Sequence, residues 1–130
     1  MTDLSSAITF VIAGPPRTKK TSNRIVRCGR FSKILPSLAF LEWQNAAAAA
    51  LQGVKKYGGF PITHAVNCRA LFFRERLVGD ACGFYQGLAD LLQHHGIVKN
   101  DSQIRTWDGS RLLKDPVNPR VIVTLEATEA

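Results

Sequence analysis

The sequence predicts one α+β domain, residues 1–130, with a mostly antiparallel, mixed sheet and two main helices. Its length fits a single compact domain and leaves little room for a second. Strand-like and helix-like runs follow one another in the order strand, basic hairpin, helix, strand, helix, strand, strand. No repeat or linker interrupts them, and the apolar residues suffice for one core.

The first two segments are predicted to be extended. Residues Ala7–Gly14 form a β-branched and aromatic run that ends at Gly-Pro-Pro, which is typical of a strand followed by a turn. Residues Asn23–Pro36 set apolar side chains among basic ones, with a glycine near the middle. This pattern favours a basic β-hairpin or an extended arm over a helix.

Two segments carry helix signals. In Ser37–Gly53, a serine can cap the N-terminus, a run of alanines favours the helix, and Gly53 is a natural stop. In Gly79–Gly96, Asp80 is a plausible N-cap and Gly96 a plausible end. The apolar residues of this second helix recur on one stripe, as expected of a helix that packs on a sheet.

The remaining segments have the composition of strands. Residues Ile62–Leu77, Ser102–Asp115 and Pro119–Ala127 are rich in β-branched and aromatic residues. The last two are expected to join through a turn in the sequence DPVNP.

Composition bounds the cellular setting. No apolar run approaches the roughly 20 residues that span a bilayer, and the first residues lack the basic start of a secretory signal. The three cysteines have no C-x-x-C spacing, which favours reduced thiols over disulfides or structural zinc. We therefore expect a cytoplasmic protein with no membrane partner. No histidine is fixed near Cys82 by the sequence, so we expect it to be a small buried side chain and not a nucleophile.

The segment AGPPRTKKTS approaches a phosphate-binding P-loop without matching it. Two prolines remove backbone N–H groups that such a loop needs, and Lys19 stands where the loop requires glycine. The segment that follows is predicted to be extended, whereas a P-loop leads into a helix. We therefore expect no nucleotide cofactor.

Basic charge concentrates in this same region of a chain whose formal net charge is +7. No acidic residue lies between Arg17 and Lys33, which suits a segment that follows the backbone of a nucleic acid. A solvated charged surface is the simpler alternative. The residues expected to bind DNA phosphates are Arg17, Lys19, Lys20, Arg24 and Arg27.

Aspartates mark the C-terminal half. Asp80 opens the second predicted helix, Asp90 lies within it, and Asp101 follows it in a loop that could return toward the helix. Carboxylates gathered together suit Mg²⁺ or Mn²⁺, and such ions beside a phosphate promote hydrolysis. The alternatives are a helix cap for Asp80, a solvated residue for Asp90 and a turn former for Asp101.

On these residues the chain resembles the RusA-type Holliday junction resolvases, over nearly its whole length. The resemblance includes the Gly-Pro basic loop, LPS before the Ala-rich helix, GIVKND, and the closing NPRVIVTLEA. The family pattern is D-x-D-N-x-x-K-x-x-x-D, a turn, and a D-D pair; Asp80, Asp90 and Asp101 match its first, helical and last aspartates. The resemblance implies a homodimer that cuts four-way DNA junctions with Mg²⁺ or Mn²⁺ held by aspartates.

Four positions depart from the family pattern. Cys82 and Asn100 replace aspartates, Gly83 replaces asparagine, and Gln86 replaces the lysine. Thiols are poor ligands for Mg²⁺ because the ion prefers hard oxygen donors. Either Asp108 supplies the missing carboxylate, which is our hypothesis, or the fold retains DNA binding and has lost or weakened cleavage.

The resemblance and the charge pattern predict a Mg²⁺-dependent, structure-specific endodeoxyribonuclease that resolves junctions in DNA recombination and repair. Asp80, Asp90 and Asp101 are the expected catalytic residues, and Asp80, Asp101 and Asp108 the expected metal ligands. The alternative is a non-catalytic DNA-binding protein on the same fold. An RNA-binding module shares the basic loop but leaves the aspartates unexplained.

Overall fold

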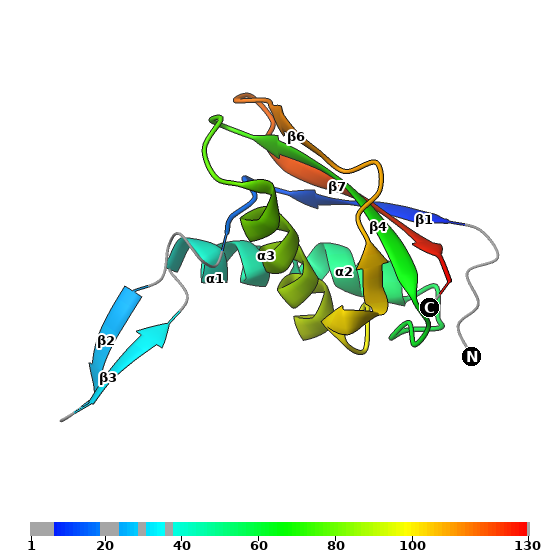
Figure 1. Cartoon of the computed structure of the whole chain (residues 1–130), viewed down its shortest axis with the longest axis horizontal. Coiled ribbons are helices and arrows are strands. Elements are labelled where there is room, and N and C mark those ends of the chain that lie inside the picture. Colours follow the sequence, from blue (N-terminus) through cyan, green and yellow to red (C-terminus); the bar gives the residue numbers. More distant parts are fainter. Residues whose placement is uncertain (1–6, 19–23, 29–30, 36–37, 130) are drawn as a thin grey trace.

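A computed structural model of the chain describes residues 7–18, 24–28, 31–35 and 38–129; for residues 24–28 and 31–35 it describes the backbone. The described chain forms a mixed sheet with helices packed against one of its faces (Figure 1). The predicted α+β class is confirmed. None of the helices in the described part combines the length and apolar character that crossing a bilayer requires.

The sheet has the strand order β1-β7-β4-β5, and β6 also pairs with β4. β7 lies antiparallel to both β1 and β4, whereas β5 and β6 run parallel to β4. The long pairings are therefore antiparallel and the short ones parallel. The bounds are β1 Ile8–Ala13, β4 Val66–Arg74, β5 Ile104–Thr106, β6 Arg111–Lys114 and β7 Arg120–Ala127.

The predicted basic hairpin is present as two paired strands outside the main sheet. β2 (Arg24–Cys28) pairs antiparallel with β3 (Phe31–Leu35), in a register that sets Cys28 opposite Phe31. The hairpin projects away from the rest of the molecule (Figure 1). The sequence places Arg24 and Arg27 on this arm.

The first predicted helix is two helices, and its predicted end at Gly53 is wrong. α1 (Leu38–Ala46) and α2 (Ala48–Lys55) meet at Ala47, whose backbone stays helical at φ −73° and ψ −14°. Gly53 lies inside α2. The left-handed conformation that suits a glycine terminus falls later, at Gly58, with φ +83°. The predicted cap Ser37 lies outside the described residues.

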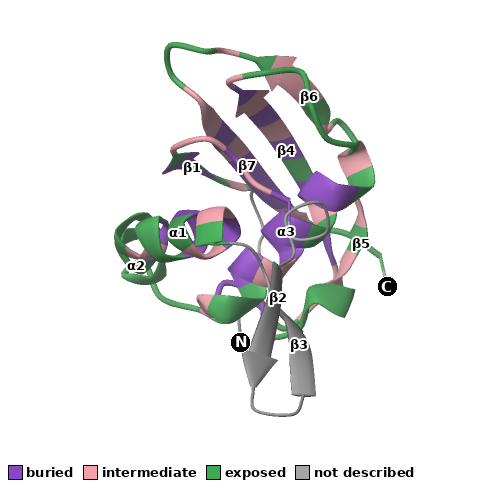
Figure 2. Cartoon of the chain, turned by 90° about the vertical axis from the view of Figure 1, so that its left-hand side faces the viewer, coloured by how far each residue is buried: buried purple, intermediate pink, exposed green. Residues whose placement is uncertain are grey.

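The second predicted helix is confirmed as α3, Ala81–His94. Asp80 is its N-cap and Gly96, with φ +72°, follows its end. The apolar stripe faces the sheet, where the Phe84 and Phe72 rings lie 5.5 Å apart. Figure 2 shows buried positions on α3 and on the strands that it covers.

The predicted strand Ser102–Asp115 is divided. A short 3₁₀ turn, Asp101–Gln103, leads into β5, and Gly109, with φ +85°, turns the chain before β6. Only Gly adopts that backbone conformation without strain, so the strand cannot continue through this position. The DPVNP turn is present. The pKa of Asp115 lies below its usual value because the Asn118 N–H and the Arg120 guanidinium donate to its carboxylate.

The core lies between the sheet and the helices. Cys68 belongs to it, and burial raises the pKa of its thiol. The larger fully buried side chains come from every layer of the fold: Ile12, Phe40, Leu51, Ile62, Val66, Phe72, Leu88, Leu91, Leu92, Ile97, Val98 and Leu125.

Candidate functional site

Asp80 occupies the start of α3 because the backbone there can turn sharply. Gly79 has φ +93°, and a Cβ on it would lie 2.8 Å from the Phe84 ring, so only glycine fits. Asp80 then accepts a hydrogen bond from the Gly83 N–H at Oδ1, at 2.8 Å. This satisfies one of the free N–H groups of the first turn. Its other carboxylate oxygen has no hydrogen-bond partner in the described part of the chain.

A second feature lies beside the outer face of α3. A hollow of about 350 Å³ is open to solvent between this helix and the segment that contains β5. We call it the Asp101 hollow. Its lining residues are Cys82, Tyr85, Gln86, Ala89, Asp101, Ile104 and Trp107.

Asp101 is held in the hollow by hydrogen bonds between backbone groups and neighbouring amide side chains. Its N–H donates to Gln93 Oε1 of α3 at 2.8 Å. Asn100 and Gln103 form a capping box around the 3₁₀ turn, and Gln103 Nε2 donates to the Ile62 carbonyl at 2.7 Å. The turn is thereby tied to α3 and to the chain ahead of β4. These contacts leave the Asp101 carboxylate exposed.

The aromatic wall of the hollow is a stacked pair. The rings of Tyr85 and Trp107 lie 4.5 Å apart with an interplanar angle of 4°. Tyr85 also packs against Phe72, with ring centroids 5.9 Å apart, so the pair rests on the core. Tyr85 was not predicted as a site residue. The sequence feature that could have identified Tyr85 is its position in the aspartate-bearing helix, one residue before the motif position Gln86.

Three positions of the D-x-D-N-x-x-K pattern and its D-D pair come together here. Cys82 and Gln86 lie one turn apart on α3, and Asp101, fifteen residues after Gln86, lines the same hollow. Cys82 is a free, exposed thiol, so its predicted burial is wrong. Cys82 lies on the outer face of α3, which turns away from the sheet, and its side chain is therefore exposed to solvent.

The other predicted carboxylates lie elsewhere. Asp80 and Asp90 are separated by ten residues of helix, which places them about 15 Å apart along the axis. Asp90 accepts a hydrogen bond from Gln44 Nε2 at 3.2 Å, on the side of α1. The backbone of Asp108 pairs with the Asn67 side chain, and its own side chain is exposed outside the hollow. No three His, Cys, Asp or Glu side chains come together as metal ligands in the residues described.

The donors of the hollow nevertheless fit one kind of ion. Asp101 offers a carboxylate and Gln86 an amide oxygen, and both are hard donors. Mg²⁺ commonly keeps several waters and takes only one or two protein carboxylates together with substrate phosphates. Such an ion needs no closed cage of protein ligands. Asp101, with Gln86 beside it, could therefore hold Mg²⁺ or Mn²⁺ at a bound phosphate.

The predicted DNA-binding residues are only partly placed. Arg17 forms an ion pair with Glu75, at 3.0 Å. Lys19 and Lys20 lie outside the described residues. Arg24 and Arg27 belong to β2, of which the backbone is described. Their role in binding stays a prediction.

No protein-family model matches the chain, and no curated protein sequence matches it. The resemblance to RusA-type resolvases therefore rests on the motif residues quoted above.

Proposed function

We propose that the chain is a metal-dependent endodeoxyribonuclease of the RusA-like kind, which cuts branched DNA. The observation that supports this is the meeting of Cys82, Gln86 and Asp101 in one open hollow. Cys82 and Gln86 lie on one face of α3, and the contact with Gln93 brings Asp101 to the same hollow, so that three motif positions line one solvent-exposed concavity, the usual form of a ligand site. DNA repair or recombination in the cytoplasm is the corresponding setting.

In the proposed mechanism the residues of the hollow position a DNA phosphate. Asp101 is fixed by the Gln93 contact and presents its carboxylate to the reacting group. Gln86 adds an amide dipole, and the Tyr85–Trp107 pair offers a flat surface for a neighbouring base. When bound, Mg²⁺ or Mn²⁺ would supply a metal-activated hydroxide and neutralise charge on the phosphate. Asp80 caps the same helix and does not line the hollow, and its predicted part in cleavage is tested separately.

DNA binding and assembly complete the proposal. The β2–β3 arm carries basic residues in its sequence and projects from the domain, as a segment that grips a DNA arm would (Figure 1). One small site cannot cut two symmetric strands, so a junction resolvase of this size acts as a homodimer, and two-fold symmetry is the commonest assembly.

The second candidate is a DNA-binding protein without cleavage. The composition of the hollow favours it, because Asp101 is the only carboxylate among the lining residues and Cys82 is a soft donor. Both candidates predict salt-dependent DNA binding, so salt dependence cannot separate them.

A cleavage assay separates them. Labelled four-way junction is incubated with the protein in the presence and absence of Mg²⁺ or Mn²⁺. We expect paired cuts that require the metal. Asp101→Asn should reduce the rate by more than the roughly 100-fold that loss of an outer-shell partner can cost.

Asp108→Asn tests the hypothesis that Asp108 supplies the missing carboxylate, which the structure places exposed and outside the hollow. We expect it to retain cleavage; loss of cleavage in this variant would support the hypothesis that Asp108 is a ligand. Tight junction binding with no cleavage in either metal would favour the second candidate.

A further inference from the structure

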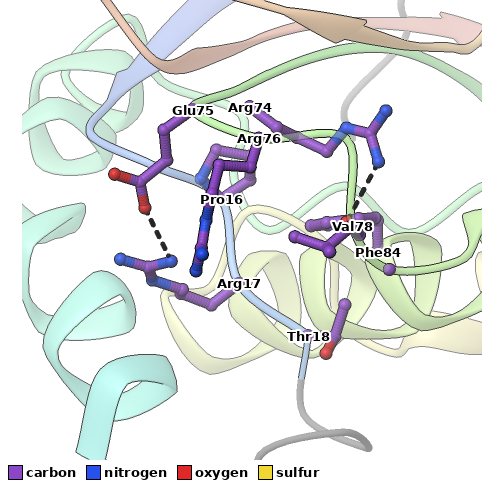
Figure 3. A pocket seen from close by; sticks show the side chains of 9 residues that line it. Pro16, Arg17, Thr18, Arg74, Glu75, Arg76, Val78 and Phe84 are labelled. Carbon is purple, nitrogen blue, oxygen red and sulfur yellow. Dashed lines mark hydrogen bonds and ion pairs between the residues drawn. The ribbon is translucent and has the colours of Figure 1, made fainter. Parts of the chain in front are cut away.

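A separate pocket lies on the other side of the first turn of α3. It has a volume of about 150 Å³ and is formed by the segment after β1 and the loop between β4 and α3 (Figure 3). We call it the arginine pocket. Its lining residues are Pro16, Arg17, Thr18, Arg74, Glu75, Arg76, Val78, Gly79 and Phe84.

Arg74 is the most unusual of these residues, because it is a cation that is 7% exposed. Its Nη1 donates to the Val78 carbonyl at 3.0 Å, and its Nε donates to the Leu113 carbonyl at 3.4 Å. The guanidinium lies 5.5 Å from the centre of the Phe84 ring. In the described part of the chain no carboxylate pairs with it.

A buried charge without a counter-ion is costly, and proteins usually pair such charges. The carbonyl groups and the ring orient Arg74 but carry no net charge. Its second terminal nitrogen, Nη2, has no hydrogen-bond partner among the residues described. Arg74 therefore contributes a fixed positive charge on the Val78 and Phe84 side of the pocket, opposite Arg17 and Arg76 (Figure 3).

The neighbouring side chains add to the positive charge. Arg17 is paired with Glu75 at 3.0 Å, and both are partly exposed. Arg76 is exposed and has no partner among the described residues. The lining contains three arginines and one glutamate, an excess of two positive charges around a small concavity, with Arg17 and Arg76 on one side and Arg74 on the other (Figure 3). Such an arrangement focuses a positive potential on the pocket.

We infer that the arginine pocket binds a phosphate group. Guanidinium groups match phosphate oxygens with paired donors, and these charge-assisted hydrogen bonds are strong. The volume is well below that of pockets for drug-sized ligands, so it suits one small group. The phosphate can belong to a nucleic-acid backbone or to a free phosphate compound, since both present the same oxygens.

The position of the pocket bears on whether its phosphate comes from DNA. Thr18 lines it, and the sequence continues directly into Lys19 and Lys20. A DNA backbone bound at this pocket would place one phosphate in it, beside a stretch of sequence that is rich in basic residues. The DNA source rests on the proposed function, whereas binding of phosphate itself does not.

Titration with inorganic phosphate at constant ionic strength, followed by NMR of the arginine Nε–H groups, tests the inference without metal or cleavage. We expect the Arg74 signal to shift with saturation. Arg76→Gln should weaken binding about tenfold, the size expected for one charge-assisted hydrogen bond. Because Arg76 is exposed and unpartnered in the described chain, this variant should fold normally.

Arg111→Gln is the matched control, because it removes an exposed arginine outside the pocket. It should leave phosphate affinity unchanged. Glu75→Gln gives a test of opposite sign: it removes the one carboxylate of the pocket and should strengthen binding about threefold. Equal losses in Arg76→Gln and Arg111→Gln, or no shift of the Arg74 signal, would overturn the inference.

Duplex DNA without a terminal phosphate distinguishes the two sources. If it shifts the Arg74 signal and inorganic phosphate competes with it, the pocket takes a backbone phosphate. If phosphate shifts the signal and DNA does not, the site is supported and the DNA source is rejected. In either case cleavage by the wild-type protein is judged separately, so failure of the pocket and failure of the proposed nuclease are distinguishable.

Discussion

The two faces of α3 do different work in the same helix. The inner face packs Phe84, Leu88, Leu91 and Leu92 against the sheet. The outer face presents Cys82 and Gln86 to the Asp101 hollow, where both are exposed. Because a helix repeats every 3.6 residues, positions three or four apart share a face, and neighbouring positions can belong to different faces. A substitution on one face should therefore affect stability, and one on the other should affect function.

The separation has one exception, which is the contact between α3 and the chain after β1. A Cβ on Gly87 would lie 2.9 Å from the Arg17 carbonyl oxygen, and one on Gly83 would lie 3.2 Å from Thr18. Two glycines in a helix each cost about 1 kcal/mol relative to alanine. The close approach that they allow places Arg17 and Thr18 in the arginine pocket. Packing on this part of α3 thus determines the shape of that pocket.

The largest effect is expected on the inner face. Leu88 is fully buried, so Leu88→Ala should lower the free energy of unfolding by about 2–5 kcal/mol through lost burial and a cavity. Urea denaturation monitored by tryptophan fluorescence measures it.

Gln86→Ala is the control on the outer face. It changes an exposed side chain two positions away and should stay within about 0.5 kcal/mol of the wild type. If the two variants lost equal stability, the division of α3 into a packing face and a site face would be wrong.

The next effect tests the exception. Gly87→Ala introduces a methyl group that meets the Arg17 backbone at 2.9 Å and the Phe40 ring at 3.4 Å. Backbone atoms cannot move aside cheaply, so we expect a loss of about 1–3 kcal/mol from overpacking. Thermal unfolding of the purified variant gives the value.

Gly53→Ala is matched to it, since Gly53 also lies within a helix but has nothing within 4 Å of an added Cβ. Alanine should stabilise α2 by up to about 1 kcal/mol. Opposite signs for the two variants would support the close approach at Gly87. A stabilising Gly87→Ala would show that the Arg17 segment does not lie on the helix.

Local signals in the sequence predicted the elements whose ends they mark. Asp80 and Gly96 bound α3 as expected, and the basic hairpin agrees with apolar residues set among basic ones on both sides of Gly29 in the sequence. Residues 102–115 were predicted less well. Whether β5 and β6 run parallel to β4 depends on tertiary pairing, which local propensity does not encode.

The site shows the same limit. Sequence spacing could not tell that Asp90 bonds to Gln44 while Cys82 and Gln86 line the same hollow as Asp101. The arginine pocket was missed because Arg74 and Arg76 lie in a run with the composition of a strand. Only the fold shows that Arg74 is buried without a carboxylate partner in the described chain.

The smallest expected change in stability concerns Asp80, at the start of α3, and it tests whether this residue acts as a helix cap. As an N-cap it accepts the Gly83 N–H at 2.8 Å, and Asp80→Ala should therefore cost about 1 kcal/mol of stability. Asp80→Asn keeps an oxygen that can accept the same bond and should retain nearly all of it, because Asn and Asp are comparable caps. Chemical denaturation of both variants measures the difference.

Junction cleavage by the same two variants then separates the cap from a metal ligand. Asp80→Asn removes the negative charge and leaves the helix intact, so any loss of metal-dependent cleavage in it cannot be attributed to unfolding. Loss in both variants would assign the carboxylate to the metal as well as to the helix. Cleavage retained in Asp80→Asn would restrict Asp80 to its structural role. Asp101 would then be the one predicted aspartate left to support the chemistry of the hollow.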